Sequence, residues 1–284
     1  MSILFRKIAF GGGGMKGILH IGPLLELQKH QPLVFPDGVY GCSIGSLFAT
    51  CVAFELPIEK VIPLVPKYLS FEKVIPDITA DHVMNSFSKK GMFGMEKFEE
   101  MIHTFFQDLD FDIKGKTISD AKMPLYIVAS NITKGVPTLF SGKVPIVSAI
   151  LASCCLPGVF KPQELYGQLY IDGDMFTPCI SSIVGSRKDA LIMILGKYPV
   201  AYVNPKNLDT MSPLLYTNTI FSMIMNQFSI AQKTPGILYL RYPKLRSTSD
   251  LNDFDIKDVL DSSAEQLRTF LAKRGDQEST ESSR

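Results

Sequence analysis

The chain has 284 residues, of which 46% are hydrophobic, so it is long enough and apolar enough to bury a sizeable core. Its 29 Lys and Arg residues almost balance its 28 Asp and Glu residues, and the formal net charge is +1. This composition excludes a largely disordered protein. The near-neutral charge argues against a nucleic-acid-binding protein, whose basic face normally shows in the total.

The N-terminal segment and the cysteines bear on location. No long apolar run with a small-residue cleavage site follows Arg6 and Lys7, so we predict no secretory signal. No stretch is apolar enough for a transmembrane helix. The five cysteines include no Cys-x-x-Cys pair, which argues against a zinc site. We expect buried free thiols in a reducing, cytoplasmic compartment.

Apolar periodicity predicts strands and helices that alternate along much of the chain. The predicted strands cover residues 3–10, 38–40, 125–129, 138–140, 169–171, 190–195 and 237–242. The predicted helices cover residues 15–29, 44–54, 57–69, 95–106, 145–153, 212–232 and 255–273. This alternation predicts an α/β fold with a mostly parallel central sheet and helices on both faces. We expect one domain over residues 1–273 and a disordered polar tail at 274–284.

A serine bracketed by glycines lies between the second predicted strand and a buried helix. The segment Gly41-Cys42-Ser43-Ile44-Gly45 matches the strand–turn–helix elbow that exposes a nucleophilic hydroxyl, and its small residues let strand and helix pack closely. A helix-capping serine is the alternative. We interpret Ser43 as a nucleophile.

The glycine run after the first strand has more than one interpretation. The P-loop pattern fails because Met15 precedes Lys16 and Gly17 follows it. The spacing Gly12-x-Gly14-x-x-Gly17 does fit a dinucleotide-binding fingerprint, with Asp37 as the ribose-binding acid. Against this, Asp37 precedes the second strand, whereas the fingerprint places its acid at that strand's end.

The same run can instead form an oxyanion hole. Consecutive N–H groups of Gly12, Gly13 and Gly14 at a helix N-terminus would stabilise negative charge that develops on a carbonyl oxygen. Lys16 would hold the loop in place or add positive potential. With Ser43, this run indicates a serine esterase.

A serine nucleophile needs a base, and we interpret the four histidines, His20, His30, His82 and His103, as structural. None follows a late strand, where a hydrolase triad would place its histidine. Asp172 follows the strand at 169–171 and precedes Gly173, which permits a tight turn. A partly desolvated aspartate at the sheet's carboxyl edge can accept the serine proton directly. An Asx-turn or helix cap is the alternative.

In this order, Gly-Gly-Gly-x-Lys-Gly, Gly-x-Ser-x-Gly and Asp-Gly resemble the patatin-like phospholipase family. Residues 17–22 and 152–160 also resemble segments of that family, and the resemblance covers about residues 8–184. It implies a metal-free and cofactor-free lipid acyl hydrolase with a Ser43–Asp172 dyad, an acyl-enzyme and oxyanion-hole amides from Gly12, Gly13 and Gly14.

The chain departs from the family pattern at two places. Asp174 stands where the family usually has Gly or Ala, and Met175-Phe176-Thr177-Pro178 lacks the asparagine usual there. Like-charge repulsion from Asp174 would raise the pKa of Asp172. A solvent-facing Asp174 is the interpretation we favour.

A lipid substrate requires apolar access to the site. Phe87, Met92 and Phe93, beside Lys89-Lys90, are candidates for an exposed membrane-binding loop, but a cap whose apolar residues pack inward is the interpretation we favour. The residues Met223-Ile224-Met225 would line an acyl channel or belong to ordinary core.

The sequence therefore predicts a peripherally membrane-associated hydrolase of phospholipid or lysophospholipid esters, with no nucleic-acid partner. A neutral-lipid esterase or thioesterase would use the same dyad. A non-catalytic lipid- or nucleotide-binding module is the alternative from another class.

Overall fold

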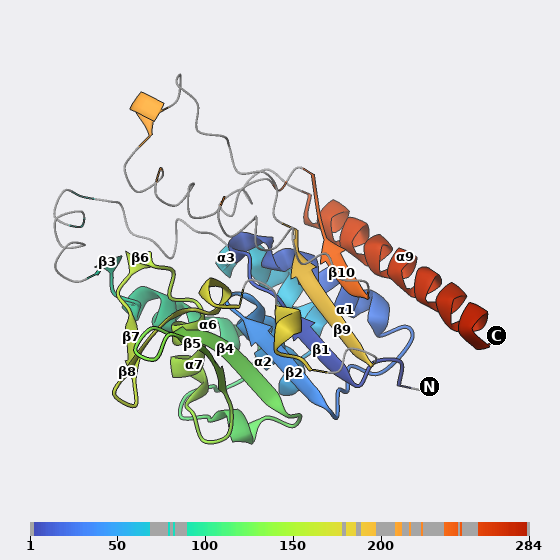
Figure 1. Cartoon of the computed structure of the whole chain (residues 1–284), viewed down its shortest axis with the longest axis horizontal. Helices are drawn as coiled ribbons and strands as arrows, with labels where there is room; N and C mark the ends of the chain where they lie inside the picture. Colours follow the sequence, from blue (N-terminus) through green and yellow to red (C-terminus); the bar gives the residue numbers. More distant parts are fainter. Residues whose placement is uncertain are drawn as a thin grey trace.

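The structure is a computed structural model that describes residues 3–68, 79, 82, 90–177, 180–185, 189–196, 208–211, 216, 223, 236–243, 245 and 255–282. A sheet of eight strands forms its centre, and helices pack against it (Figure 1). The predicted α/β class with a mostly parallel central sheet is confirmed. Most of the predicted helix at 212–232 lies outside the described residues, including Ile224 and Met225.

Five strands of the sheet are parallel, in the order β10-β9-β1-β2-β4. They are β1 (Lys7–Phe10), β2 (Gly38–Cys42), β4 (Leu125–Asn131), β9 (Ala190–Leu195) and β10 (Ile237–Leu240). Their residues are nearly all buried, as expected for short apolar runs covered on both faces. The pairing of Phe10 with Gly41 brings the ends of β1 and β2 level, so the loops that follow them are neighbours.

The remaining strands form an antiparallel corner around β4. These strands are β5 (Val136–Phe140), β7 (Gln163–Leu165) and β8 (Gln168–Asp172). Residue Ile127 pairs with β2 and with β5, whereas Ala129 pairs with β5 and with β8. Because a strand has two edges, β2 and β8 must share one edge of β4, one after the other. The carboxyl ends of β2 and β8 therefore meet.

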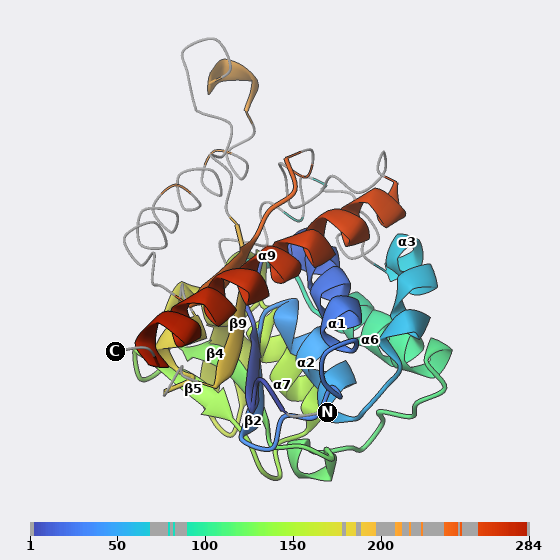
Figure 2. The ribbon, with the colours of Figure 1, turned by 90° about the vertical axis from the view of Figure 1, so that its right-hand side faces the viewer.

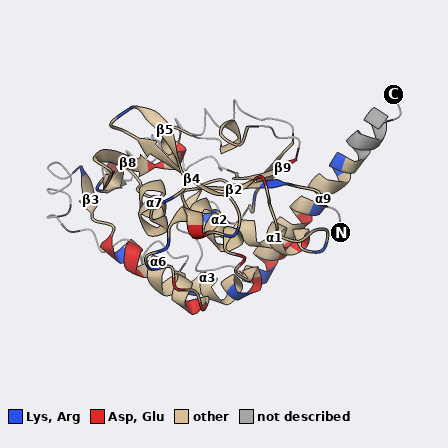
Figure 3. Cartoon of the chain, turned by 90° about the horizontal axis from the view of Figure 1, so that it is seen from below, with Lys and Arg blue, Asp and Glu red and all other residues tan. Residues whose placement is uncertain are grey.

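The described helices, both α-helical and 3₁₀, pack mainly on one face of the sheet, and their apolar sides make the larger core. They include η1 (Gly14–His20), α1 (Ile21–Leu27), α2 (Gly45–Ala53), η2 (Ile58–Leu64), α3 (Val65–Tyr68), α6 (Glu96–Asp108) and α7 (Ile146–Ser153). The other face carries a smaller core, in which the turn η5 (Ile180–Ser182) covers Ala9, Tyr40 and Ile192. Figure 3 shows α1, α3 and α6 on one side of the strands, with charged residues along them.

Two predicted helices have a different local form. The segment predicted as a helix at 15–29 begins as the 3₁₀ helix η1 and becomes α-helical only at Ile21. The segment at 57–69 is likewise a 3₁₀ helix, η2, followed by one α-helical turn. Pro63 lies inside η2, and its missing N–H and ring geometry disfavour a regular α-helix there.

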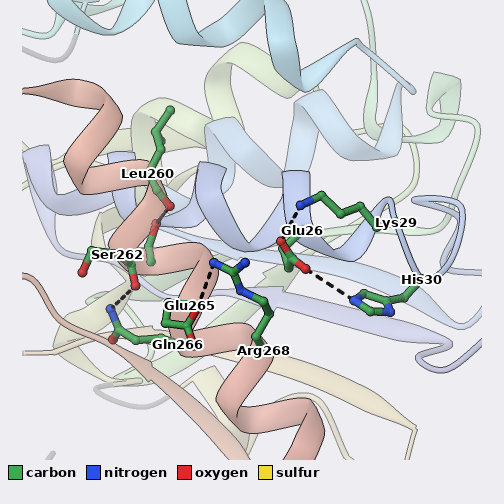
Figure 4. A network of polar contacts seen from close by, with 9 residues as sticks. Glu26, Lys29, His30, Leu260, Ser262, Glu265, Gln266 and Arg268 are labelled. Atoms are coloured by element: carbon green, nitrogen blue, oxygen red, sulfur yellow. Dashed lines mark hydrogen bonds and ion pairs between the residues drawn. The ribbon is translucent and has the colours of Figure 1, made fainter.

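The C-terminal helix α9 (Ile256–Ser282) lies beside α1 (Figure 2). The two helices approach so closely that a side chain at Gly22 would lie 2.2 Å from the carbonyl oxygen of Leu260. Figure 4 shows the polar rim of this contact, where Arg268 pairs with Glu265 near Glu26. The hydrogen bond from Lys29 holds the pKa of Glu26 below its usual value, and the Arg268 charge acts in the same direction.

The helix α9 includes most of the segment at 274–284, for which we predicted a disordered tail. Arg274 lies over the ring of Phe5, 4.7 Å from its centroid. This cation–π contact ties the helix to the body of the molecule, and it joins residues too distant in the chain for a sequence pattern to reveal.

A second sheet pairs β3 (Gly91–Phe93) with β6 (Gly158–Phe160). Met92 and Phe93 are each 7% exposed, so they pack inward, as in the interpretation that we favoured, and do not form an exposed membrane-binding loop. Pairing with β6 turns their side chains into the core. Phe87 and Lys89 lie outside the described residues. Among the described helices we find none with the length and apolar character needed to cross a bilayer.

Candidate active site

Ser43 lies in the sharp turn between β2 and α2, as the elbow motif predicts. Its backbone φ is 51°, a left-handed conformation that is rare for a residue with a side chain. Two contacts hold this strained turn: Ser43 N–H donates to Ser153 Oγ over 2.8 Å, and Ser46 Oγ donates to the Ser43 carbonyl over 2.6 Å. Strain maintained by its surroundings is common at functional sites.

The glycines around the elbow permit close packing. A Cβ at Gly45 would lie 2.2 Å from the carbonyl oxygen of Phe10, and one at Gly41 would lie 2.6 Å from Ser46 Cα. Gly17 is similarly close to the side chain of Ile44, and Gly173 to the backbone of Val128. Any side chain at these positions would push the elbow away from its neighbours.

Asp172 is hydrogen-bonded to Ser43. Ser43 Oγ donates to Asp172 Oδ2 over 2.6 Å, and Asp172 is 4% exposed. The two residues meet because β8 ends level with Ala129, next to the end of β2 on the same edge of β4. We expected Asp172 at the carboxyl edge of parallel strands. The strand that carries it is antiparallel and approaches the site from the opposite direction.

The glycine run lies beside this pair at the N-terminus of η1. Gly13 and Gly14 adopt positive φ angles of 154° and 57°, which glycine tolerates without a steric cost. Within the described part of the chain, no hydrogen bond is donated by the N–H groups of Gly12, Gly13 and Gly14. Donors at a helix N-terminus that are free of protein partners can hold an oxyanion.

Two buried side chains of η1 follow the glycine run. His20 is fully buried, and its Nε2 lies 3.0 Å from the carbonyl oxygen of Gly11. Burial lowers the pKa of His20 to about 4, so the ring is neutral at pH 7. Lys16 is also buried in η1, at 7% exposure. The His20 contact agrees with its predicted structural role, and the role of Lys16, in holding the loop or adding positive potential, stays a prediction.

Sequence reasoning missed Ser153 as part of the site. Its Oγ accepts from the Ser43 N–H and donates to the carbonyl of Val128 over 2.6 Å, which links α7, β4 and the elbow. Ser153 is the last residue of α7 and lies more than a hundred residues from Ser43 in the chain, so no local motif connects them. The only signal was the resemblance of residues 152–160 to a family segment.

Asp174 does not face solvent as we expected. It lies in the turn η4 (Gly173–Met175), half-buried, and its N–H donates to Asp172 Oδ1 over 2.9 Å. Cys42 Sγ donates to Asp174 Oδ1 over 3.4 Å. Burial, together with the nearby charges of Asp174 and Asp172, raises the pKa of the Cys42 thiol well above its usual value, so the thiol keeps its proton.

The residues proposed for rival interpretations lie elsewhere. Asp37 precedes β2, at the opposite end of the sheet from the glycine run, and is paired with Arg6 over 2.6 Å. His30 contacts Glu26, and the His82 ring packs on Phe93. Among the described residues, therefore, the side chain in position to take the Ser43 proton is a carboxylate and not an imidazole.

An apolar cavity of about 30 Å³ lies on the helical side of the elbow. Ile44, next to the nucleophile, and Met15, next to the glycine run, both line it. The rest of its wall comes from α2, η2, α3 and α6: Leu47, Phe48, Cys51, Val61, Leu64, Val65, Tyr68, Phe98, Met101, Ile102 and Phe105.

The family model described as patatin-like phospholipase matches residues 8–179. Because this match covers more than half of the chain, the chain belongs to the patatin-like phospholipase family. Two solved structures have a similar fold. VipD from Legionella pneumophila matches 95% of this chain and 67% of its own, with a TM-score of 0.55 and 16% identity. The type III effector protein ExoU matches 95% of this chain and 53% of its own, with a TM-score of 0.50 and 16% identity.

Curated relatives match at similar, modest identity. An uncharacterised NTE family protein of Mycobacterium tuberculosis is 26% identical over 66% of this chain and 48% of its own. Lysophospholipase NTE1 of Candida albicans is 25% identical over 87% of this chain and 19% of its own. This chain thus spans about half the length of the mycobacterial relatives and a smaller part of the yeast protein.

Proposed function

We propose that the chain hydrolyses carboxylic esters of lipids, with Ser43 as nucleophile and Asp172 as base. The observation that carries this proposal is the 2.6 Å hydrogen bond from Ser43 Oγ to Asp172 Oδ2, at a strained elbow beside a glycine run. A hydroxyl that donates to a buried carboxylate is oriented to lose its proton to it. Family membership, and the lysophospholipase activity named for the yeast relatives, support the lipid substrate.

The first half-reaction forms an acyl-enzyme. Asp172 takes the proton of Ser43 as Oγ attacks the ester carbonyl carbon, and the carbonyl oxygen becomes an oxyanion. The N–H groups of Gly12, Gly13 and Gly14 receive that charge, and one such donor is worth about 3–4 kcal/mol in other hydrolases. The tetrahedral intermediate collapses, and the leaving alkoxide takes the proton from Asp172.

The second half-reaction releases the fatty acid. Asp172, again ionised, takes a proton from water, whose oxygen attacks the acyl carbon. The resulting intermediate expels Ser43 Oγ, which recovers the proton from Asp172. No step requires a group other than those of the chain, the ester and water.

The apolar cavity is suited to the acyl chain. Its lining contains no charged residue, and it includes Ile44, the residue that follows the proposed nucleophile in the chain. At about 30 Å³ it holds no more than a water-sized volume, so an acyl chain would have to displace flexible side chains such as Met15 and Met101. We favour phospholipid or lysophospholipid esters, and neutral-lipid esters or thioesters would use the same site.

Peripheral binding to a membrane surface is part of the proposal. With Met92 and Phe93 buried, a group of exposed apolar side chains near the site is the better candidate for the contact: Ile132, Leu139, Leu169 and Phe176, each 37–41% exposed. Leu139 pairs opposite Val128 and Ile132 bonds to Leu169, so alternation places these strand residues on one face of the antiparallel corner. Phe176 joins them through its bond to Ser130.

The test is active-site labelling combined with lipid hydrolysis. The protein should react with a fluorophosphonate probe and release fatty acid from lysophosphatidylcholine micelles or phosphatidylcholine vesicles. Ser43→Ala should abolish both, and Ser141→Ala, at an exposed serine, should change neither. Equal labelling of Ser43→Ala and the wild type would remove Ser43 from its role.

The membrane contact is tested separately. Leu139→Asp combined with Leu169→Asp should weaken sedimentation with vesicles of phosphatidylcholine and phosphatidylserine, and should spare hydrolysis of p-nitrophenyl butyrate. Unchanged sedimentation would place the contact elsewhere.

A further inference from the structure

The second carboxylate of the Asp-Gly-Asp segment lies inside the site rather than beside it. Asp174 receives a hydrogen bond from the Cys42 thiol, and its own N–H holds Asp172 Oδ1. Its carboxylate therefore lies against the residue before the nucleophile, and its backbone orients the base.

The Asp174 carboxylate lies close to Gly12, the first of the three glycines proposed to form the oxyanion hole. A point one bond from Gly12 Cα, where a Cβ would be, lies 2.3 Å from Asp174 Oδ2 and 2.8 Å from Ser43 Cβ. The carboxylate, the nucleophile and the first of the proposed oxyanion-hole glycines thus surround one small volume. A carbonyl under attack by Ser43 must place its oxygen near this volume.

A charge at this position acts on the reaction directly. Negative charge on Asp174 would oppose the oxyanion, and it would do so in a site where burial weakens solvent screening. A neutral Asp174 would remove this opposition, and its O–H could donate to the oxyanion. The same residue would therefore inhibit or assist the reaction, depending on one proton.

The described contacts favour charge on Asp172 over charge on Asp174. Asp172 accepts hydrogen bonds from Ser43 Oγ and from the Asp174 N–H, and both stabilise its charged form, whereas Asp174 accepts one, over 3.4 Å, from the weakly donating Cys42 thiol. Two carboxylates in one site resist double ionisation. Cys42 and Cys154 face the pair as neutral thiols because burial raises their pKa values well above normal, and the pKa of Cys155 is raised to about 12. Lys16, on the adjacent η1, is also buried, and positive charge there would stabilise whichever carboxylate is ionised.

We propose that Asp174 is a charge gate for ester hydrolysis: the enzyme turns over with Asp172 ionised and Asp174 protonated, and ionisation of Asp174 slows formation of the oxyanion. This inference rests on the proposed function of the Ser43–Asp172 pair. It assigns a role to the position at which the chain departs from the family pattern, where Gly or Ala is usual and neither can carry a charge.

The test is the pH dependence of kcat/KM on p-nitrophenyl butyrate for four forms of the enzyme. In the wild type, kcat/KM should fall as pH rises through the ionisation of Asp174. Asp174→Asn and Asp174→Gly, which cannot ionise, should lack this fall, so that the ratio of variant to wild type grows about 10-fold or more towards alkaline pH. Asp174→Glu keeps the charge and should retain the fall.

Parallel pH profiles for the wild type and Asp174→Asn would overturn the gate, as would a loss in Asp174→Asn that is equal at every pH. Fluorophosphonate labelling of Ser43 separates this failure from that of the proposed function. A labelled, active wild type with parallel profiles refutes the gate alone. A wild type that neither labels nor hydrolyses the ester refutes the dyad, and the gate with it.

Discussion

The parallel strands and the antiparallel corner supply the site with different kinds of group. The ends of β1 and β2 supply backbone N–H groups and a hydroxyl on a strained turn, through Gly12, Gly13, Gly14 and Ser43. The corner supplies carboxylates, Asp172 and Asp174, through the point at which β8 ends against β4. The first contribution depends on local backbone conformation, and the second depends on strand register between distant segments.

This difference predicts which substitutions affect chemistry and which affect assembly of the site. The glycine N–H groups and the Ser43 hydroxyl depend on a local backbone conformation, which the residue type at each position permits. The carboxylates from the corner depend on their position, which is determined by the register between β8 and β4.

The largest effect is expected for Asp172→Asn. The amide keeps the shape of the side chain but cannot accept the serine proton, so kcat should fall by at least about 10³-fold. Fatty acid release measures this fall, and circular dichroism should show an unchanged fold. Asp261→Asn, at an exposed position on α9, is the matched control and should behave as wild type. An Asp172→Asn enzyme with more than a tenth of wild-type kcat would show that another group is the base.

Gly12→Ala should have the next largest effect, a loss of about 10²-fold in kcat or more. Its methyl group would collide with Asp174 Oδ2 and with Ser43 Cβ, which would displace the glycine run from the nucleophile. Gly275→Ala provides the control, because a side chain at Gly275 meets nothing within 4 Å. Wild-type kinetics in Gly12→Ala would mean that the run does not contact the reacting ester.

Local patterns were enough to predict the groups on the parallel strands. The elbow at Ser43 and the run at Gly12 are each contained in a few consecutive residues whose types specify their conformation. Asp172 was also identified, through Gly173 and the resemblance to a family. The direction from which Asp172 reaches the site was not predicted. That direction depends on the antiparallel pairing of β8 with β4, which a three-residue apolar run does not reveal.

Features that depend on contacts between distant segments could not be predicted. Ser153 supports the elbow across more than a hundred residues, and Asp174 turns inward because Cys42 and Gly12 leave a place for it. Inward packing of Phe93 was the favoured interpretation, but its strand pairing with β6 was not predicted. In each case the deciding partner lies far away in the chain.

A smaller effect is expected on stability, at the histidine behind the glycine run. The pKa of His20 is about 4 in the folded protein and about 6.5 when unfolded, so the unfolded state binds the extra proton as pH falls below 6.5. The free energy of unfolding should therefore drop by about 2 kcal/mol between pH 7.5 and pH 5 from this residue. Urea denaturation measures it. His20→Gln keeps a donor for Gly11 and should lose this part of the pH dependence; an equal dependence in both proteins would contradict the burial argument.

The smallest effect is expected at the opposite end of the sheet, and it separates the esterase from the dinucleotide-binding interpretation. Asp37→Asn removes the exposed pair with Arg6 and leaves the carboxyl ends of β1 and β2 unchanged. Ester hydrolysis should therefore equal that of the wild type, and a titration with NAD should show no binding that the substitution weakens. The strands β1 and β2 lie between Asp37 and Gly17, so no single dinucleotide can use both as the fingerprint requires. Tight NAD binding lost in Asp37→Asn would show that this end of the sheet, and not the elbow, carries the function.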